Sequence, residues 1–460
     1  MALTNSVIEI ISKIPGLKNF YRKNIRKDLI YLEKKTFNEL LLLPSIDIDE
    51  QVIIQEARLT KLLEYAYVNC PYYNELFYQN NISVASLRDF KRIPFLDKMI
   101  IKQNASKILS TKTKTTERRK SNTGGSTGEP LEFYTDMNSI AVDNAHHKYL
   151  YHLMGWKPGD LIVDSGGIRL NNKLRMKNTF WIKYPDHSIW GDWGFSALYL
   201  NKGNINFYVD KILELKPTIF RGYPSFFHEL SIYILQNKIN LEFKIKGINL
   251  TAEYCSEEQR IIIERAFHSK VFLEYGQGEK TLFCYSESKS YDLKSSPIYG
   301  YLEVLNENGE DSNPGDEGEV VVSGLINFAM PFIRYKTGDR AILKSRAGGI
   351  VTFEKILGRT QDFILDKHSH KIYLTAIIFG QHYQAFKEIK QWQIIQEKAG
   401  YIEFNIVKDD NFSDEDEKEI IQKIKSAADV EIKISYVENI QPTKSGKKLF
   451  LIQKITDVLS

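Results

Sequence analysis

A glycine-rich segment at residues 121–136, SNTGGSTGEPLEFYTD, contains the residue types that bind phosphate. Glycines let the backbone approach phosphate oxygens closely, and small hydroxyl groups donate hydrogen bonds to them. The segment is not a Walker loop, because no Gly-Lys-Ser/Thr follows, and it is not a dinucleotide fingerprint. The alternative interpretation is a flexible hairpin between two strands. The residues that could contact phosphate are Thr123, Gly124, Gly125, Ser126, Thr127 and Gly128.

Further motifs follow along the chain. They are YGQGE at 275–279, FIRYKTGD at 332–339, LGRTQD at 357–362 and QPTKSGKK at 441–448. Each is weak alone, because a lysine or an aspartate after glycine usually lies in a solvated turn. In this order and at these separations, they resemble the successive core motifs of the adenylate-forming superfamily. That superfamily includes acyl-CoA synthetases, luciferases and peptide-synthetase adenylation domains.

Less specific sequence patterns indicate one branch of this superfamily. LLEYAYVNCPYYNELF at 62–77, NISVASLRDFKRIPFLDK at 81–98, RGYPS at 221–225 and TAEYCSEEQR at 251–260 are similar to the phenylacetate–CoA ligase and CapK-like capsule-biosynthesis branch. The resemblance extends from about residue 58 to residue 454, nearly the whole chain. It implies ATP and Mg²⁺ as cofactors, with coenzyme A as one acceptor.

The resemblance also implies a role for each matching residue. The loop at 123–128 would surround the ATP phosphates. Glu279 would help to hold Mg²⁺ and serve catalysis, and Asp339 would accept hydrogen bonds from both ribose hydroxyls. Lys447 matches the C-terminal catalytic lysine that reaches the forming acyl–phosphate bond. A carboxylate attacking the α-phosphate brings two anions together, and a fixed cation lowers that barrier.

Other matching residues would surround the nucleotide and the acid. Tyr275 and Gly276 would flank the adenine and the acyl pocket, and Glu253 belongs to the loop that lines the adenine. Arg359 would begin a hinge whose pivot lies within 359–362. Tyr223, in RGYPS, and His147 are candidates for contact with the acid. A histidine pair in a helix, such as His146 and His147, more often has one exposed and one packed member.

The sequence departs from the superfamily pattern at several positions. Gly124 stands where the loop often has serine, Gly278 replaces the usual threonine, and Lys336 replaces the more usual arginine. None of these changes removes a charged catalytic group, so we expect activity. Some relatives carry a structural zinc after the YGxTE-like motif. Residues 281–300 offer only Cys284 and no histidine, so we expect no such zinc site here.

The elements that must position these residues alternate between strand and helix. Apolar runs such as DLIVDSGG, PTIFRGYP and KVFLEYG alternate with helical patterns, including SEEQRIIIERAFH with Ser256 as N-cap, which predicts an α/β fold. From residue 299, short strands joined by Asn-Gly and Pro-Gly turns predict a β-rich subdomain. We predict a large N-terminal adenylate-forming domain, 1–358, rich in parallel strands. A small mobile α+β domain, 359–460, would follow it.

Composition limits the remaining functional classes. The chain has 460 residues, 43% of them hydrophobic, and a formal net charge of only +4. The dispersed charge argues against a nucleic-acid partner. Three separated cysteines indicate free thiols in a reducing cytosol, and hence a cytoplasmic protein. No apolar run reaches the roughly 20 residues of a membrane span. The basic, amphipathic segment 7–27 could lie weakly on an anionic membrane surface or form a helix packed on the main body.

We therefore expect an acid ligase that forms an acyl-adenylate from ATP and a carboxylic acid. The acceptor could be a thiol such as coenzyme A, or an amine such as an amino sugar or an amino acid. The resemblance to capsule-biosynthesis proteins adds a role in surface-polysaccharide synthesis as a hypothesis. The rival from another class is a non-catalytic relative that binds a nucleotide or a partner. The presence of Glu279, Asp339 and Lys447 argues against this rival.

Overall fold

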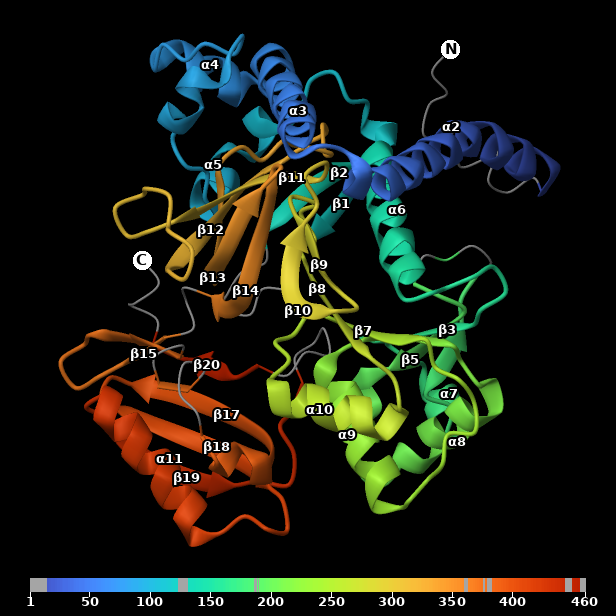
Figure 1. Ribbon diagram of the computed structural model, residues 1–460, viewed down its shortest axis with the longest axis vertical. Coiled ribbons are helices and arrows are strands. Elements are labelled where there is room, and N and C mark those ends of the chain that lie inside the picture. Colours follow the sequence, from blue (N-terminus) through green and yellow to red (C-terminus); the bar gives the residue numbers. More distant parts are fainter. Residues whose placement is uncertain are drawn as a thin grey trace.

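The computed structural model describes residues 15–122, 131–185, 188, 190–359, 363–374, 377–378, 383–442 and 449–455. Figure 1 shows N-terminal helices and β-rich strands at the top. An α/β region lies at the lower right, and the C-terminal residues lie at the lower left. The mixed architecture of helices and strands confirms the predicted α/β class.

Helices form the first part of the chain. They are α2 (Pro15–Leu42), α3 (Ile48–Asn69), α4 (Pro71–Gln79) and α5 (Lys98–Ile108). A break at Pro71 separates α3 from α4, and the proline occupies the first turn of α4, where its missing N–H costs nothing. Helix α2 runs beside α6 (Met137–Leu153), and Leu40, Ala145 and Tyr149 share one apolar cluster there. The C-terminal part of α2 is therefore packed on the main body, whereas residues 7–14 of the basic segment lie outside the described residues.

The α/β region contains the parallel part of a twelve-stranded sheet. Strands β3, β6, β7 and β8 pair in parallel in the order β8–β7–β6–β3, and β5 pairs in parallel with β3. The elements here are β3 (Ile162–Gly166), α7 (Asn172–Arg175), β4 (Trp181–Lys183), β5 (Trp193–Ser196), α8 (Ile205–Leu215), β6 (Ile219–Gly222), α9 (Pro224–Gln236), β7 (Gly247–Thr251), α10 (Glu257–Phe267) and β8 (Val271–Gly276). As predicted, Ser256 caps α10, because its side chain accepts a hydrogen bond from the backbone N–H of Gln259.

The predicted β-rich part continues this same sheet. Strand β9 pairs with β8, and the order then runs through β10, β14, β13 and β12 to β11, all antiparallel. Its strands are β9 (Phe283–Glu287), β10 (Ser290–Ser295), β11 (Gly300–Leu305), β12 (Glu317–Gly324), β13 (Tyr335–Ala347) and β14 (Ile350–Arg359). A separate hairpin, β1 (Arg118–Asn122) with β2 (Glu132–Asp136), flanks the glycine-rich segment.

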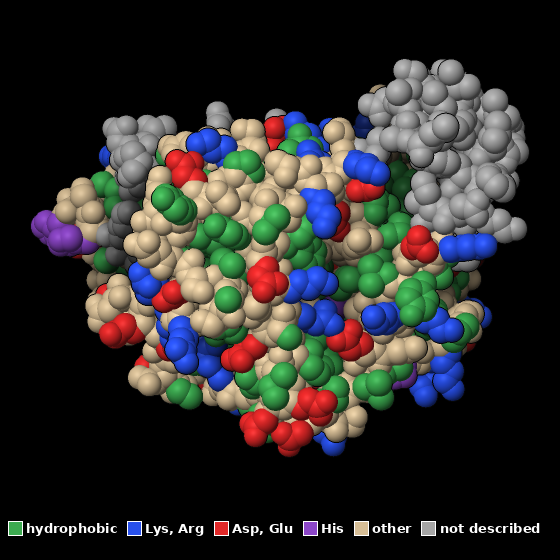
Figure 2. Space-filling model, turned by 90° about the horizontal axis from the view of Figure 1, so that it is seen from above, with side chains coloured by type: hydrophobic (Ala, Val, Ile, Leu, Met, Phe, Trp, Pro, Cys, Tyr) green, Lys and Arg blue, Asp and Glu red, His purple; other side chains and the backbone are tan. Residues whose placement is uncertain are grey.

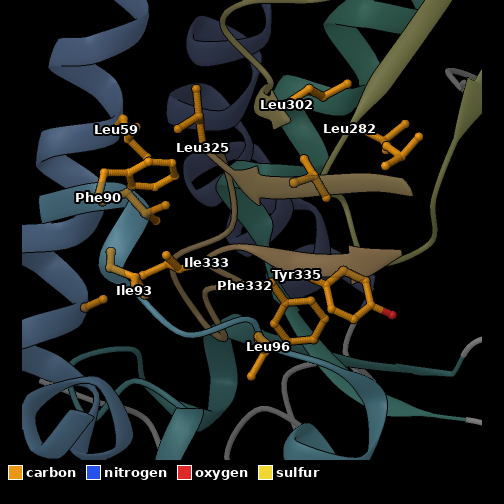
Figure 3. Packing of buried hydrophobic residues seen from close by; sticks show 14 of the residues in the cluster. Leu59, Phe90, Ile93, Leu96, Leu282, Leu302, Leu325, Phe332, Ile333 and Tyr335 are labelled. Atoms are coloured by element: carbon orange, nitrogen blue, oxygen red, sulfur yellow. The ribbon is translucent and has the colours of Figure 1, made fainter. Parts of the chain in front are cut away.

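The two largest apolar cores of this region join different elements. The first joins the N-terminal helices to the β-rich strands. Figure 3 shows Leu59 of α3 and Phe90 facing Leu302 and Leu325, while Leu96 lies beside Phe332 and Tyr335. A second core lies between the parallel strands and α8, α9 and α10, with Phe220, Phe227 and Phe267 in edge-to-face contact.

The C-terminal residues form sheets and a core of their own. Strands β15 and β16 make a hairpin, and β19, β18, β17 and β20 make a four-stranded sheet in that order. The elements are β15 (Phe363–Leu365), β16 (Lys371–Tyr373), β17 (Ile389–Lys398), β18 (Tyr401–Lys408), α11 (Asp414–Ala427), β19 (Glu431–Tyr436) and β20 (Leu451–Gln453). Ile394, Phe404 and Ile420 are fully buried in this core. We refer to residues 363–455 as the C-terminal unit.

The surface is mixed in charge. On the face seen in Figure 2, Lys and Arg side chains are interspersed with Asp and Glu rather than gathered in one field. Within the part of the chain that the structure describes, none of the helices has the length and apolar character needed to cross a bilayer.

Candidate active site

The carboxyl ends of three parallel strands bring predicted motifs to one edge of the sheet. Strand β6 ends at Gly222, β7 at Thr251 and β8 at Gly276. In open α/β sheets, ligands bind outside this edge. The predicted residues that lie here are Tyr223, Glu253, Tyr275 and Gly276.

Glu253 joins the loop after β7 to helix α9. Its Oε2 accepts a hydrogen bond from the backbone N–H of Ser225 at 3.1 Å, in the first turn of α9. The preceding residue, Ala252, has a φ of +68°, a left-handed conformation that residues other than glycine seldom adopt. Such strain is typical of functional loops. Tyr223, the N-cap residue of α9, is half-buried, and burial together with nearby Glu253 raises the pKa of its hydroxyl.

Asp339 and Tyr275 meet, although 64 residues separate them in the sequence. The Tyr275 hydroxyl donates a hydrogen bond to Asp339 Oδ2 at 2.7 Å, and Gln277 Nε2 donates to the same oxygen at 3.2 Å. Burial and the Asp339 carboxylate hold the pKa of Tyr275 well above its usual value, so the phenol remains a donor. The fold thus joins the YGQGE and FIRYKTGD motifs. Asp339 also pairs with Arg359 across the β13–β14 ladder.

Glu279 lies in the turn after β8, and its side chain is buried. The Tyr335 hydroxyl lies 3.4 Å from its Oε1. Mg²⁺ at nucleotide sites is usually held by one or two carboxylates together with substrate phosphates and water, so a single buried carboxylate fits this ion. Among the described residues, no three His, Cys, Asp or Glu side chains are grouped to hold a metal.

Several predicted site residues lie outside the described residues. They are Thr123, Gly124, Gly125, Ser126, Thr127, Gly128 and Lys447, together with hinge positions 360–362. The backbone of Arg359 is described as the last residue of β14. The roles of all these residues stay predictions.

A group of buried polar side chains lies on the parallel strands and on α6, and of its members the sequence predicted only His147 as a site residue. The group comprises Asp164 on β3, Arg221 on β6, Asn249 on β7, Glu274 on β8 and His147 on α6, and we call it the polar cluster. Arg221 Nη1 donates to Asp164 at 3.0 Å, and Arg221 Nη2 donates to Glu274 at 3.3 Å. Asn249 Nδ2 donates to Glu274 at 2.6 Å, and Thr251 Oγ1 donates to it at 3.0 Å.

The pKa values of the two carboxylates of the polar cluster are shifted in opposite directions. Burial raises the pKa of both, because it disfavours the charged form. For Asp164 this effect prevails over Arg221, and the pKa stays above its usual value. For Glu274, the Arg221 guanidinium, His147 and the Asn249 amide outweigh burial and hold the pKa well below its usual value. Glu274 is therefore firmly ionised at neutral pH.

His147 belongs to this cluster, and both members of the histidine pair are buried. The prediction that one of them would be exposed is therefore wrong, because α6 lies between α2 and the sheet. His147 Nδ1 lies 3.4 Å from Glu274, and His147 Nε2 lies 3.7 Å from Asp143. Asp143 also accepts hydrogen bonds from Lys280 and from the Tyr299 hydroxyl.

A signal for the polar cluster was present in the sequence. Within the runs DLIVDSGG, PTIFRGYP and KVFLEYG, one charged residue stands near the carboxyl end of each apolar stretch, namely Asp164, Arg221 and Glu274. A charge inside a strand that is buried on both faces needs a partner. Three such strands in parallel would place their charges side by side.

A cavity of about 580 Å³ separates the C-terminal unit from the ends of α9 and α10. Glu253 and Tyr254 line it on one side, and Trp392 and Phe450 line it on the other. The rings of Tyr254 and Phe450 lie 6.2 Å apart. The cavity therefore opens beside the loop that carries Glu253.

The chain is similar in sequence to known ligases and to protein CapK. The CapK C-terminal domain family matches residues 367–454. Protein CapK of Staphylococcus aureus is 26% identical over 420 residues, which cover 87% of this chain and 89% of CapK. Phenylacetate–coenzyme A ligase of Thermus thermophilus is 24% identical, over 68% of this chain and 71% of that enzyme.

The fold has a counterpart among solved structures. A crystal structure of 2-hydroxyisobutyryl-CoA ligase in the postadenylation state superposes with a TM-score of 0.67 at 18% identity. The match covers 90% of this chain and 91% of that chain, so it includes the C-terminal unit. Sequence homology to CapK and to phenylacetate–CoA ligases, the match to the CapK C-terminal domain and the shared fold together support the CapK-like branch of the adenylate-forming ligases.

Proposed function

We propose that this chain activates a carboxylic acid with ATP, forming an acyl-adenylate and pyrophosphate, and then transfers the acyl group to an acceptor with release of AMP. The observation that carries the proposal is the contact between Tyr275 and Asp339. It unites two motifs that in adenylate-forming enzymes address one nucleotide. The relatives named phenylacetate–coenzyme A ligase support the same overall reaction.

Asp339 would bind the ribose of ATP, and Tyr275 would lie beside the adenine and the acyl pocket. A carboxylate has two acceptor oxygens and can take both ribose hydroxyls. The hydrogen bonds from Tyr275 and Gln277 fix the orientation of this carboxylate before ATP arrives. Glu253, held on the first turn of α9, would position the adenine loop.

Glu279 would hold Mg²⁺, which when bound offsets negative charge on the ATP phosphates. The loop at 123–128 would bind the phosphates through backbone N–H groups and small hydroxyls. Lys447 would neutralise charge at the reacting α-phosphate. The proposed chemistry needs little covalent work from the protein, because alignment and fixed charge lower the barrier.

The second step requires space for an acceptor, and the cavity beside Glu253 supports this requirement. We propose coenzyme A as the acceptor, because the phenylacetate–coenzyme A ligases use this thiol by name. An amine, such as an amino sugar in surface-polysaccharide synthesis, is the alternative acceptor. We further propose that residues 359–460 move between the two steps, which their separate sheets and core support.

The test is acid-dependent exchange of labelled pyrophosphate into ATP, measured with a panel of carboxylic acids. We expect exchange with at least one acid and its loss when Mg²⁺ is chelated. Coenzyme A and a panel of amines are then added separately, and the acylated product is identified by mass spectrometry. ATP binding without exchange for any acid would favour the non-catalytic relative. Product with an amine and none with coenzyme A would reverse the choice of acceptor.

A further inference from the structure

The polar cluster lies at the strand ends where, under the proposed function, the acyl group of the substrate would be recognised. Glu274 directly precedes Tyr275 on β8, and Thr251, which donates to Glu274, ends β7. Arg221 directly precedes Gly222, at the end of β6. An apolar acid would be expected to meet apolar side chains at these strand ends. This chain instead presents an arginine, a glutamate and an asparagine.

The fold itself gives no reason for these charges. A buried ion pair often contributes no more stability than well-packed apolar side chains of the same volume, because desolvation offsets the attraction. The cluster nevertheless places Asp164, Arg221 and Glu274 in a largely dehydrated layer, each no more than 9% exposed. Buried charges beside the edge of a sheet where ligands bind are better explained by recognition of a ligand than by packing of the core.

Within the described part of the chain, three buried atoms of this region have no hydrogen-bond partner. They are Ser165 Oγ, Arg221 Nε and Asn249 Oδ1. Each belongs to a residue that is at least nine-tenths buried, and an unpaired polar group there costs free energy. Ser165 lies beside the cluster, because it pairs with Gly222 across β3 and β6. A Cβ on Gly222 would lie only 2.0 Å from Ser165 Oγ, so glycine is required at that point.

The hydrogen-bonding capacity of the unpaired atoms limits which chemical group of a ligand could bind them. Arg221 Nε can only donate, and Asn249 Oδ1 can only accept. An ammonium group has no acceptor to offer the arginine, and a methyl group satisfies neither atom. A hydroxyl group both accepts and donates. Trp190 covers this place, because its ring lies 4.6 Å from the Arg221 guanidinium and 5.6 Å from the His147 ring.

We infer that the acid activated by this chain is a hydroxy acid whose acyl hydroxyl groups bind the polar cluster. This inference rests on the proposed function, since it concerns the acyl group of the adenylated acid. The inferred substrates are hydroxylated acids, including sugar acids, rather than aryl, fatty or amino acids.

The experiment compares acids of matched size, each as the plain, hydroxylated and aminated form, such as butyrate, 3-hydroxybutyrate and 3-aminobutyrate. Two readouts are used on the full chain. One is kcat/KM for pyrophosphate exchange, and the other is acid binding by calorimetry with a non-hydrolysable ATP analogue. A site built around a substrate hydroxyl rejects the analogue that lacks it, so we expect a preference of about 10²-fold or more.

Ser165→Ala tests the cluster directly, because it removes an unpaired hydroxyl without breaking a described hydrogen bond. We expect it to lower the ratio of hydroxylated to plain acid by about 10-fold. The matched control is Ser231→Ala, a buried serine that bonds within α9 and should leave this ratio unchanged. A wild-type preference that Ser165→Ala does not reduce would overturn the assignment to the polar cluster.

The two readouts separate this inference from the proposed function. Exchange and binding that favour the plain or the aminated acid would reject the hydroxy-acid inference and leave acid activation standing. Tight binding of hydroxy acids with no exchange would reject acid activation and leave the pocket assignment standing. Neither binding nor exchange for any acid would reject both.

Discussion

Protonation of His146 should destabilise this protein in mild acid. The side chain is fully buried, with Nδ1 2.8 Å from the Val142 carbonyl and Nε2 2.8 Å from Ser296 Oγ. A carbonyl only accepts, so Nδ1 carries the proton and Nε2 accepts from the Ser296 hydroxyl. Burial lowers the pKa of His146 from 6.5 to about 4, because the charged ring would lose its water.

The sign and size of the effect follow from this pKa. Below pH 6.5 the unfolded chain binds a proton that the folded chain refuses, so the free energy of unfolding falls as the pH drops towards 4. The full stabilisation is present above pH 6.5. A gap of about 2.5 between the two pKa values corresponds to a loss of about 3 kcal/mol across this range.

The assay is urea unfolding followed by tryptophan fluorescence between pH 7 and pH 4. His146→Gln should lower the free energy of unfolding at pH 7. It should also reduce the number of protons taken up on unfolding between pH 6.5 and pH 4 by about one, which lowers the slope of the unfolding free energy against pH. The same change at His152, an exposed residue of the same helix, controls for the loss of a histidine from α6. Equal pH dependence in wild type and His146→Gln would refute the reasoning.

Three further predictions test the proposed catalytic lysine, the proposed ribose contact and the proposed hinge. Lys447→Ala should cut acid-dependent pyrophosphate release by about 10²-fold or more while ATP binding is retained, and equal activity would remove this lysine from the mechanism. Asp339→Asn should raise the KM for ATP, and an unchanged ATP affinity by calorimetry would contradict the ribose assignment. Gln361→Pro, which fixes φ near −65°, should impair one half-reaction far more than the other at a nearly unchanged melting temperature. Proportional slowing of both half-reactions, or of neither, would count against a moving C-terminal unit.

Local features of the fold could be predicted from the sequence because their causes are local. Ser256 begins α10, and Pro71 divides α3 from α4, since capping and a missing N–H act within one turn. The turns after residue 299 likewise indicated strands. Partner choice is not local, so the sequence did not show that these strands join the parallel sheet through β10 and β9.

The candidate site also contains features that the sequence could indicate and features that depend on the arrangement of distant strands. Roles for Tyr275 and Asp339 around one nucleotide were expected only because their motifs resembled one family, and their direct contact was not predicted, since no spacing rule connects residues 64 apart. The polar cluster depends on strand order, because Asp164, Arg221 and Glu274 become neighbours only when β3, β6, β7 and β8 align in parallel. Burial of both His146 and His147 likewise depends on residues distant in sequence, because Phe283 of β9 lies against both rings.

Strand β8 links the two halves of the proposed site through its register. Successive side chains of a strand point to opposite faces, so Glu274 faces the polar cluster while Tyr275 faces Asp339. Thr251 pairs with Glu274 on one side, and Cys284 pairs with Tyr275 on the other, which fixes that alternation from both neighbours. A slip of one residue would exchange the two faces. Nucleotide recognition and acyl recognition, as proposed, therefore share one strand, and neither can shift its register without the other.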